Sequence, residues 1–333
     1  MPETKAPSHF AGARGIALGA GLLGLALLPL VAGASPYILG LLISALILSG
    51  LALSWALLGN LGGMVSFGHA AFFGVGSYAS ALLAARLGLP VLLAIPLGGV
   101  ITTVLSVAML PALRLSGPYF ALAILAYAQI FRILATELDW LTGGAAGLQR
   151  YPGLPTIFGF NLADRTGSYL LVLSVVLLFA VVYVLIRRSH VGTALRAIAD
   201  SEDATRVVGV NATLLKTWML LLSAFIGGVF GALNAHIIGF LEPDYAFSGV
   251  WSVMPIIAAV FGGYRSVLGP IFGAVVIYMF DQVVAKSLIP VGHQILLGIV
   301  LAVMVLVAPN GLSGLVGRLF PRAARTRQGS APC

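Results

Sequence analysis

The sequence RRSHVGTALRAIADSEDATRVVGVNATLLK, residues 187–216, is a long charged interruption between apolar segments, and the rest of the chain is arranged around it. Segments apolar and long enough to cross a bilayer flank it on both sides, so it lies outside the hydrocarbon of a membrane. Within it, Val191, Ala194, Leu195 and Ile198 recur at i, i+3, i+4 and i+7, which predicts a short amphipathic helix. We refer to residues 187–216 as the hinge.

The second half of the hinge predicts another short helix. Asp200 or Ser201 can cap it, and Glu202 and Asp203 then fall in its first turn, where acids suit the helix dipole. Gly209 is placed to end it. A helix lying on anionic lipid would be basic along its whole polar face, so the acidic corner favours a protein partner over a lipid surface.

Composition assigns the chain to the membrane proteins. Of 333 residues, 60% are hydrophobic and 8% charged, against about 25% charged in a soluble domain. The formal charge of +8 does not indicate nucleic-acid binding, because the basic residues lie in short loops and at the two ends. Cys333 is the single cysteine, which excludes an internal disulfide and a cysteine-based metal site.

The apolar segments predict an all-α fold, a polytopic transmembrane helical bundle of about eight to ten spans with glycine-broken or re-entrant segments. The expected spans are residues 15–34, 37–58, a third into which the glycine-rich passage 59–76 merges and which ends near 85, then 91–113, 119–138, 168–186, 217–240, 249–263, 269–285 and 293–308. Residues 139–167 are too irregular to cross hydrocarbon exposed to lipid. Three parts result: an N-terminus (1–14), a transmembrane domain (15–308) that contains the hinge, and a basic tail (309–333).

Charge asymmetry predicts the orientation. With the hinge in the cytoplasm, alternation of the spans puts most of the 18 basic residues on the same side, together with both termini. We therefore expect a multi-pass protein of the inner (plasma) membrane with both termini cytoplasmic. An even number of spans is required, and ten fits; eight with re-entrant segments is the alternative.

The glycine-rich passage offers candidates for a path through the membrane. Its small residues let backbone approach a solute closely, and its polar groups can line a wet cavity. The candidates are Gly62, Gly63, Ser66, Gly68 and His69. Tight helix packing, with His69 bonded to a neighbouring backbone carbonyl, is the alternative interpretation.

A short motif recurs in the second half of the chain. GGMVSFG at residues 62–68 resembles GGYRSVLG at residues 262–269, and both read Gly-Gly-x-x-Ser followed closely by Gly. Paired glycine interruptions in two halves are typical of repeated transporter folds. Chance is the alternative in so glycine-rich a chain, which has 41 glycines.

Charged residues near the predicted spans require partners, because a charge at mid-membrane costs roughly 2.5–3.5 kcal/mol. Arg132, Glu137 and Asp139 cluster at one end of a span, which favours pairing there, and Arg132 could instead reach a carboxylate substrate. Asp281 is a lone acid that could serve proton coupling, whereas Lys286 can extend to the interface.

Known catalytic and nucleotide-binding motifs are missing from the sequence. No phosphate-binding loop, H-E-x-x-H zinc motif or Gly-x-Ser-x-Gly elbow occurs, and the five histidines lack ligand spacing. We therefore expect no enzyme, no catalytic residue, no metal and no cofactor in this chain, and no nucleic-acid partner.

Seven passages together resemble one known family. They are GGMVSFGHAAFFGVGSYAS (62–80), PALRLSGPYFALAILAYAQIFR (111–132), LTGGAAGL (141–148), VGTALRAIADSEDATRVVGVN (191–211), SAFIGGVFGALNAHIIGFLEPDYAF (223–247), FGGYRSVLGPIFGA (261–274) and APNGLSGL (308–315). Over residues 35–315 the chain is similar to the inner-membrane permease subunits of branched-chain amino acid ABC importers of the LivM type.

The resemblance implies a pore subunit with several partners: a related second permease, two cytoplasmic ATP-binding subunits, a substrate-binding protein and the lipid bilayer. The hinge then resembles the coupling segment that ATPases grip. Its coupling residues would be Gly192, Ala194, Leu195, Ile198, Asp200, Glu202, Ala204 and Gly209, and Gln129 and Asn234 would join the path candidates. ATP hydrolysis would belong to the separate subunits, and Leu195→Asp should abolish their association.

Departures from the family pattern concern the cargo. Ala199 stands where Arg is frequent, Gln129 where an acid is common, and Arg265 where Gly is common. The expected function is import of branched-chain or related small amino acids by alternating access. Two alternatives remain, an ion-coupled secondary transporter and an ABC permease for urea, amides or aromatic acids.

Overall fold

A computed structural model describes residues 35–157, 159–263, 266–288, 290, 292–307 and 311. The predicted first span (15–34) and nearly all of the tail lie outside the described residues. Within them the chain is mostly helical, and eight helices are long and apolar enough to cross a membrane. The predicted all-α, polytopic fold is confirmed.

The eight candidate spans follow the chain in order. They are α2 (Pro36–Ala56) with the π-helical turn η1 (Leu57–Leu61), α3 (His69–Leu87), α4 (Val91–Ser106) with η2 (Val107–Arg114), α5 (Pro118–Glu137), α7 (Arg165–Arg188), α10 (Ala212–Ile238), α11 (Pro243–Ala246) with α12 (Val250–Gly262), and α13 (Leu268–Met279) with η4 (Phe280–Ala285) and α14 (Lys286–Leu288). The predicted last span is α15 (His293–Val307), a helix of 15 residues.

Two boundaries differ from the sequence prediction for physical reasons. Helix α10 begins at Ala212, five residues before the expected start, because the Asn211 side chain caps it by accepting a hydrogen bond from Leu214 N at 3.0 Å. Residues 62–68 form no helix, so α2 and α3 are separate elements joined by an unwound segment.

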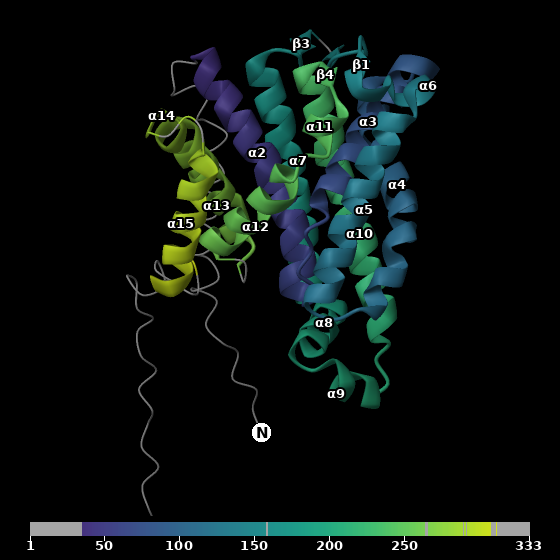
Figure 1. Cartoon of the computed structure of the whole chain (residues 1–333), viewed down its shortest axis with the longest axis vertical. Coiled ribbons are helices and arrows are strands. Elements are labelled where there is room, and N and C mark those ends of the chain that lie inside the picture. The colour runs from purple at the N-terminus through teal and green to yellow at the C-terminus, as the bar shows by residue number, and fades with distance from the viewer. Residues whose placement is uncertain are drawn as a thin grey trace, which may run out of the picture.

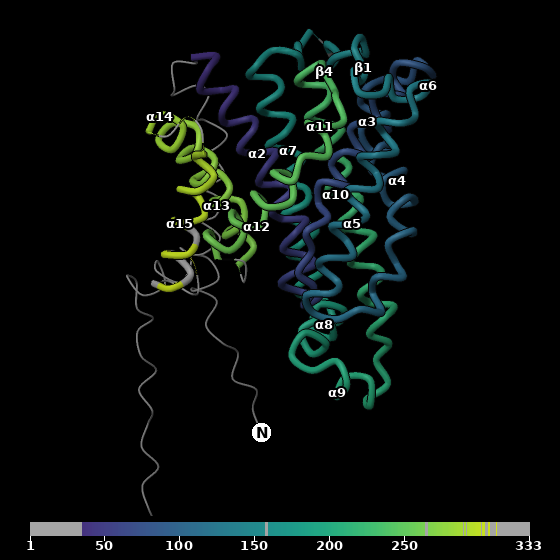
Figure 2. Tube along the Cα trace, viewed as in Figure 1, coloured from purple at the N-terminus to yellow at the C-terminus, as the bar shows by residue number. Residues whose placement is uncertain are grey.

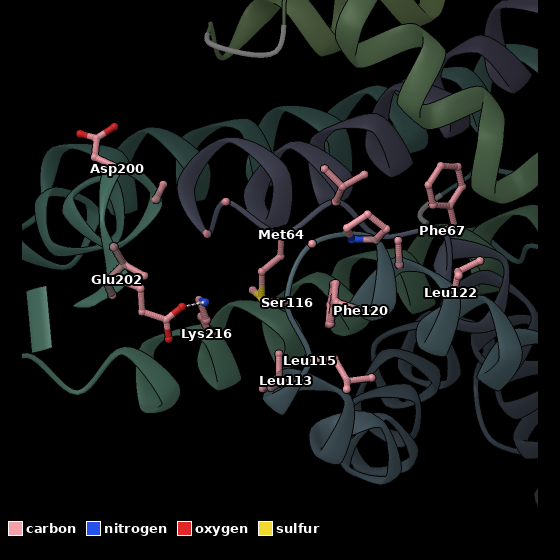
Figure 3. A pocket seen from close by; sticks show the side chains of 18 of the residues that line it. Met64, Phe67, Leu113, Leu115, Ser116, Phe120, Leu122, Asp200, Glu202 and Lys216 are labelled. Atoms are coloured by element: carbon pink, nitrogen blue, oxygen red, sulfur yellow. Dashed lines mark hydrogen bonds and ion pairs between the residues drawn. The ribbon is translucent and has the colours of Figure 1, made fainter. Parts of the chain in front are cut away.

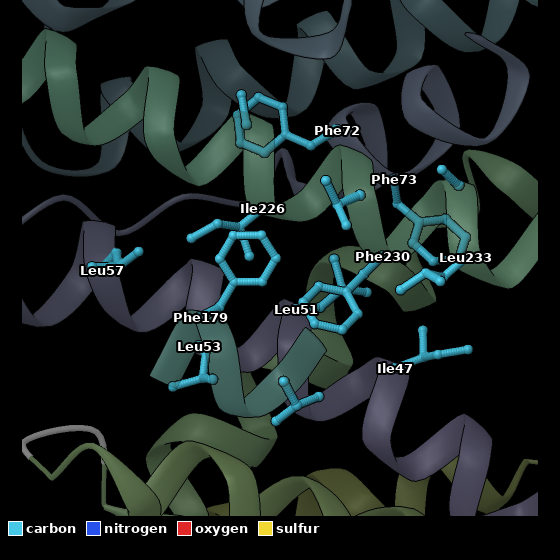
Figure 4. Close-up of a cluster of buried hydrophobic side chains, with 14 of the residues drawn as sticks. Ile47, Leu51, Leu53, Leu57, Phe72, Phe73, Phe179, Ile226, Phe230 and Leu233 are labelled. Atoms are coloured by element: carbon cyan, nitrogen blue, oxygen red, sulfur yellow. The ribbon is translucent and has the colours of Figure 1, made fainter. Parts of the chain in front are cut away.

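Helix α10 lies at the centre of the larger part of the bundle, against α2, α3 and α4. Glycines let the backbones touch: a Cβ on Gly76 would overlap Gly228 of α10, and one on Gly231 would overlap the Phe73 carbonyl. Around this contact α2, α3, α7 and α10 bury a cluster of large apolar side chains (Figure 4). This packing makes α3, α4 and α10 one close-packed unit.

A smaller group of helices packs on the other side of α2. Helices α12, α13 and α15 lie together there (Figures 1 and 2). They contribute Ala258, Ile277 and Leu297 to a separate apolar cluster that also includes Leu48 and Trp55 of α2. Helix α2 is therefore shared between the two groups.

The two ends of the bundle carry different structures. At one end, which we call the cap end, lie α6 (Asp139–Thr142), η3 (Gly144–Ala146) and two short antiparallel ladders. In these ladders β1 (Leu148–Gln149) pairs with β4 (Phe240–Leu241), and β2 (Thr156–Ile157) pairs with β3 (Phe160–Asn161). The hinge helices α8 (His190–Asp200) and α9 (Glu202–Val207) lie at the other end, the hinge end (Figure 1).

Candidate functional site: a cavity between the hinge and an unwound segment

The hinge folds into the two predicted helices. Ser189 Oγ accepts a hydrogen bond from Gly192 N at 3.3 Å and caps α8, and Ser201 Oγ accepts one from Ala204 N at 3.4 Å and caps α9. Of the two predicted caps, Ser201 is thus the one used. Gly209 follows α9 with a φ of 85°, the left-handed conformation that glycine adopts without strain.

The apolar side of α8 faces the protein's own bundle. Leu195 is fully buried and Ile198 is 3% exposed, while Gly192 is buried so close to the preceding helix that a Cβ would overlap the Ile186 carbonyl. The other predicted coupling residues are more accessible: Ala194 and Glu202 are half-buried, and Asp200, Ala204 and Gly209 are exposed. The most exposed apolar residues of the hinge are Val207 and Val208, which follow the acidic corner.

A charged cluster fastens α9 to the start of α10. The Glu202 carboxylate pairs with Lys216, and its other oxygen pairs with Arg206 Nη2 at 2.7 Å. The hydrogen bond from Lys216 is the main reason that the pKa of Glu202 lies below its ordinary value of 4.5. At neutral pH Glu202 is therefore an anion that connects α9 to the first turns of α10.

The unwound segment, residues 62–68, runs from the hinge toward the middle of the bundle. At the start of the segment, Gly62 N and Met64 N donate hydrogen bonds to the Leu58 carbonyl of η1, at 3.1 and 3.0 Å. Gly63 has a φ of 64°, and a Cβ placed on it would lie 3.1 Å from Ala199 Cβ of the hinge. The unwound segment and α8 are thus in direct contact.

Farther along, the unwound segment is fixed by its own side chains. Ser66 Oγ accepts a hydrogen bond from Gly68 N at 3.2 Å, and Trp55 Nε1 donates one to the Ser66 carbonyl at 3.0 Å. A Cβ on Gly68 would overlap Ile124 of α5. Only glycine allows the chain to pass α5 at this distance.

A cavity of about 850 Å³ lies between these elements (Figure 3). One wall is the unwound segment, the second is the first half of α5 with the turn before it, and the third is the hinge. The side chains labelled in Figure 3 are Met64, Phe67, Leu113, Leu115, Ser116, Phe120, Leu122, Asp200, Glu202 and Lys216. The interior is apolar, and the charged groups are grouped at the hinge.

Five of the predicted path residues lie in or beside the cavity. Gly62 and Gly63 line the cavity. Ser66 and His69 are fully buried beside it, and His69 Nε2 lies 3.3 Å from Ser223 Oγ of α10. Gly68 is buried against α5 as described above.

The remaining two path candidates lie away from this cavity. Gln129 is exposed farther along α5 and accepts a hydrogen bond from Arg132 Nε at 3.1 Å. Asn234 is 3% exposed and donates one to Tyr245 Oη at 3.0 Å. The structure therefore brings Gly62 and Gly63 together with Ile198, Asp200 and Glu202, and leaves Gln129 and Asn234 outside.

Sequence reasoning missed most of the cavity lining. Residues 113–125 contribute chiefly aliphatic side chains, which cannot be distinguished in sequence from residues that face lipid. One local signal was present: Gly117-Pro118 separates two spans, and Gly117 has a φ of 57°. Such a turn can position a helix start beside an opening, although it does not reveal the opening.

The two similar motifs have similar local structure. Gly63 and Gly263 both have positive φ, 64° and 96°, and each lies in a break between two helices. Ser66 Oγ accepts from Gly68 N, and Ser266 Oγ accepts from Gly269 N at 2.8 Å. The motif therefore marks the same kind of helix break twice, although residues 264 and 265, including the predicted departure Arg265, lie outside the described residues.

The charged side chains pair differently from the prediction. Arg132 bonds with Asp244 of α11 at 2.8 Å, a residue 112 positions away, rather than with the nearby Glu137 or Asp139. Asp281 is 3% exposed, and its Oδ1 lies 3.6 Å from His293 Nε2 of α15. Asp281 is thus not isolated, because α15 brings a histidine to it.

Comparison with known proteins bears directly on this arrangement. The profile of the branched-chain amino acid transport system permease component family matches residues 37–308, which include the eight candidate spans except Pro36, the hinge and the unwound segment. The chain belongs to this family. It is therefore a multi-pass permease component, in a family of membrane subunits rather than of enzymes.

Individual relatives of the permease support the same family at modest identity. The high-affinity branched-chain amino acid transport system permease protein LivM of Salmonella typhimurium is 29% identical over 280 residues, 76% of this chain and 64% of LivM. LivM of Escherichia coli is 28% identical over the same shares. The fructose import permease protein FrcC of Rhizobium meliloti is 28% identical over 37% of this chain and 35% of its own length. The match thus spans just under two thirds of each LivM, and no solved structure matches significantly.

Proposed function

We propose that this permease is the membrane pore subunit of an ATP-driven importer for branched-chain or related small amino acids. The observation that carries the proposal is the direct contact between the hinge and the unwound segment, at Ala199 and Gly63, on the wall of the 850 Å³ cavity. A force on the hinge reaches a segment that lines the cavity without passing through any other element.

Each end of the molecule would bind different partners. Two ATP-binding subunits would bind the hinge from the cytoplasm, a related second permease would complete the pore, and a binding protein would deliver the solute at the cap end. The charge asymmetry of the sequence supports this orientation, with the hinge and both termini in the cytoplasm and the protein in the inner membrane. The permease domain is assigned to residues 15–308, between an N-terminus (1–14) and a tail (309–333).

Alternating access would use the unwound segment as its moving part. Residues 62–68 have no helical hydrogen-bond ladder to break, so they change conformation at lower cost than a packed helix. The hinge helices move as a unit because Leu195 and Ile198 bury α8 against the bundle and Glu202 connects α9 to α10. Closure of the ATPases would shift α8 and carry Gly63 with it.

Two other functions make different predictions. An ion-coupled secondary transporter would use Asp281, which is buried next to His293, and would require no ATPase. A related ABC permease for a sugar, urea, an amide or an aromatic acid would share the hinge and differ in its cargo, as the fructose relative illustrates.

The decisive experiment is uptake into proteoliposomes that contain the permease, its second permease and the two ATP-binding subunits, with binding protein added outside. We expect leucine uptake that requires ATP and stops when the ATPases are omitted. Uptake without ATPases that is lost in Asp281→Asn would contradict the proposal and support the ion-coupled alternative.

The docking surface has its own test. Leu195→Asp would first disrupt the packing of the hinge, because Leu195 is fully buried. Val207→Asp and Val208→Asp test docking more directly, since these side chains are 87% and 76% exposed. We expect both variants to insert and fold normally but to lose copurification with the ATPases, while Phe160→Asp, an exposed apolar site at the cap end, retains it. Normal copurification of the valine variants would remove α9 from the docking surface.

A further inference from the structure

A second, smaller cavity lies at the cap end, along the last turns of α5. Its volume is about 230 Å³, and Arg132, Thr136 and Glu137 of α5 line it together with Pro243 and Asp244 of α11. Pockets for drug-sized ligands measure about 300–1,000 Å³, so this one suits a smaller solute. Helix α5 thus lines one cavity with its first half and another with its last turns.

The charges of this cavity are only partly matched. Arg132 uses one N–H on Asp244 at 2.8 Å and another on Gln129 at 3.1 Å, out of the five that a guanidinium carries. The Asp244 side chain is 80% exposed, and Glu137 is exposed and forms no ion pair within the described part of the chain. One guanidinium therefore faces two carboxylates, and N–H groups of Arg132 and oxygens of Asp244 and Glu137 remain available to a ligand.

This polar face is unusual for a membrane span. Gln129, Arg132 and Thr136 lie at i, i+3 and i+7 on one side of α5, within a span that is mostly apolar. A charge costs roughly 2.5–3.5 kcal/mol at mid-membrane. Arg132 instead lies near the cap-end terminus of α5, where a long basic side chain reaches the membrane interface, and it lines a cavity there. The face therefore borders water or a solute rather than lipid.

We propose that the cap-end cavity is a binding subsite for a zwitterionic amino acid. The α-carboxylate takes the free N–H groups of Arg132, the α-ammonium lies between Asp244 and Glu137, and an aliphatic side chain contacts Ile133 and Pro243. This subsite rests on the proposed import function and adds to it a recognition site for the cargo within the permease itself. A sugar or an amide carries no charge to match these groups, so they would remain unpaired or pair only with each other.

Binding to the purified full-length permease tests the subsite without ATPases. Ligands that bind the folded state raise the unfolding temperature, so thermal unfolding in lipid nanodiscs is the measurement. The probes are L-leucine, 3-methylbutanoate, which lacks the amine, 3-methylbutylamine, which lacks the carboxylate, and fructose, each at millimolar concentration. We expect leucine to raise the unfolding temperature and the three other compounds to leave it unchanged.

Substitutions test whether the leucine-induced rise in unfolding temperature comes from the cap-end cavity. Arg132→Gln and Asp244→Asn should abolish the leucine shift, Arg132→Lys should keep part of it, and Arg165→Gln, an exposed arginine on α7 outside the cavity, should keep all of it. If Arg132→Gln does not fold, Asp244→Asn decides, because its side chain is largely exposed. An equal shift with all four compounds, or a full leucine shift in Asp244→Asn, overturns the subsite.

Transport separates this proposal from the proposed function. In the complete importer Asp244→Asn should raise the KM for leucine roughly tenfold, the loss of one charge-assisted contact, with little change in kcat. ATP-driven leucine uptake with an unchanged KM in this variant overturns the subsite and leaves the importer intact. Selective leucine binding without ATP-driven uptake supports the subsite and refutes the importer.

Discussion

The two Gly-Gly breaks share a motif and a local conformation, yet their surroundings are opposite. The first, at 62–68, lies between the hinge and an 850 Å³ cavity, and Gly63 has only Ala199 nearby. The second, at 262–269, is tightly packed at its glycines: a Cβ on Gly262 would overlap the Gly269 carbonyl, and a Cβ on Gly311 would overlap Gly263 N. The motif produces a helix break, and the neighbours decide whether the break has room to move.

The largest expected effect separates the two first glycines. Gly262→Ala has no space and should cost about 3 kcal/mol or more of stability through overpacking. Gly62→Ala meets the Leu58 carbonyl at 2.9 Å and the flexible end of Met64 at 3.0 Å, and should cost about 1 kcal/mol. Thermal unfolding of both variants in the same detergent measures the difference. Equal losses would mean that the two breaks are packed alike.

The second glycines test the contact with the hinge. Gly63→Ala forces a side chain into φ 64°, at a cost of about 1–2 kcal/mol, and presses on Ala199. We expect ATP-driven uptake to fall severalfold while ATP hydrolysis continues. Adding Ala199→Gly relieves the contact but not the backbone strain, so the double variant should recover uptake without recovering stability. If uptake and stability recover together or not at all, hinge contact is not what limits transport.

Of the two serines in the motif, Ser66 and Ser266, the more deeply buried one should lose more stability when it is replaced by alanine. Ser66 is fully buried, so Ser66→Ala leaves Gly68 N without its acceptor and should cost about 1–3 kcal/mol. Ser266 is half-buried, and water can replace its hydroxyl, so Ser266→Ala should cost about 0.5–1 kcal/mol. Chemical denaturation of the two variants provides the comparison, and a larger loss for Ser266→Ala would contradict it.

The smallest effect is a pH dependence confined to the hinge beside the first break. The folded-state pKa of Glu202 is lowered by Lys216, so its contribution is present above the ordinary carboxyl value of 4.5 and is lost as the pH falls through the lowered folded value. Amide hydrogen exchange of residues 202–211 should therefore accelerate, relative to residues 217–238 of α10, as the pH falls below 4.5. Glu202→Gln should show fast exchange at neutral pH as well, and Asp203→Asn, an exposed acid on the same turn, should behave as the wild type. Protection in Glu202→Gln equal to the wild type would show that the ion pair does not hold the hinge.

The spans and the hinge were predictable because their signals are local. Spacing and capping residues located α8 and α9, and Gly209 marked the end of α9. The direction of the apolar stripe was not predictable, since periodicity shows that Leu195 and Ile198 share a face without showing what covers it. The family resemblance is confirmed by the comparisons, whereas the coupling and path residues stay predictions.

Long-range and backbone features escaped sequence analysis for a physical reason. Asp244 reaches Arg132 across 112 residues, and His293 reaches Asp281 through the packing of α15, so neither pair has a local signature. Sequence analysis placed residues 62–68 in a glycine-rich passage that merges into the third span, without showing where the helix begins, because glycine, serine and phenylalanine are all compatible with a membrane helix. In the structure residues 62–68 form no helix, and the chain passes α5 so closely that a Cβ on Gly68 would overlap Ile124.

The ladder between β1 and β4 has a mechanical consequence. It joins the chain that follows α5 to the chain that follows α10 at the cap end, with Leu148 opposite Leu241. Helix α5 spans 20 residues, or about 30 Å, so a tilt of about 5° around that junction displaces its hinge-end tip by roughly 2.6 Å. The same tilt leaves the charged cavity beside the junction almost unchanged. This is the geometry of a lever, with the proposed subsite beside its pivot and the widest displacement at the end that faces the hinge.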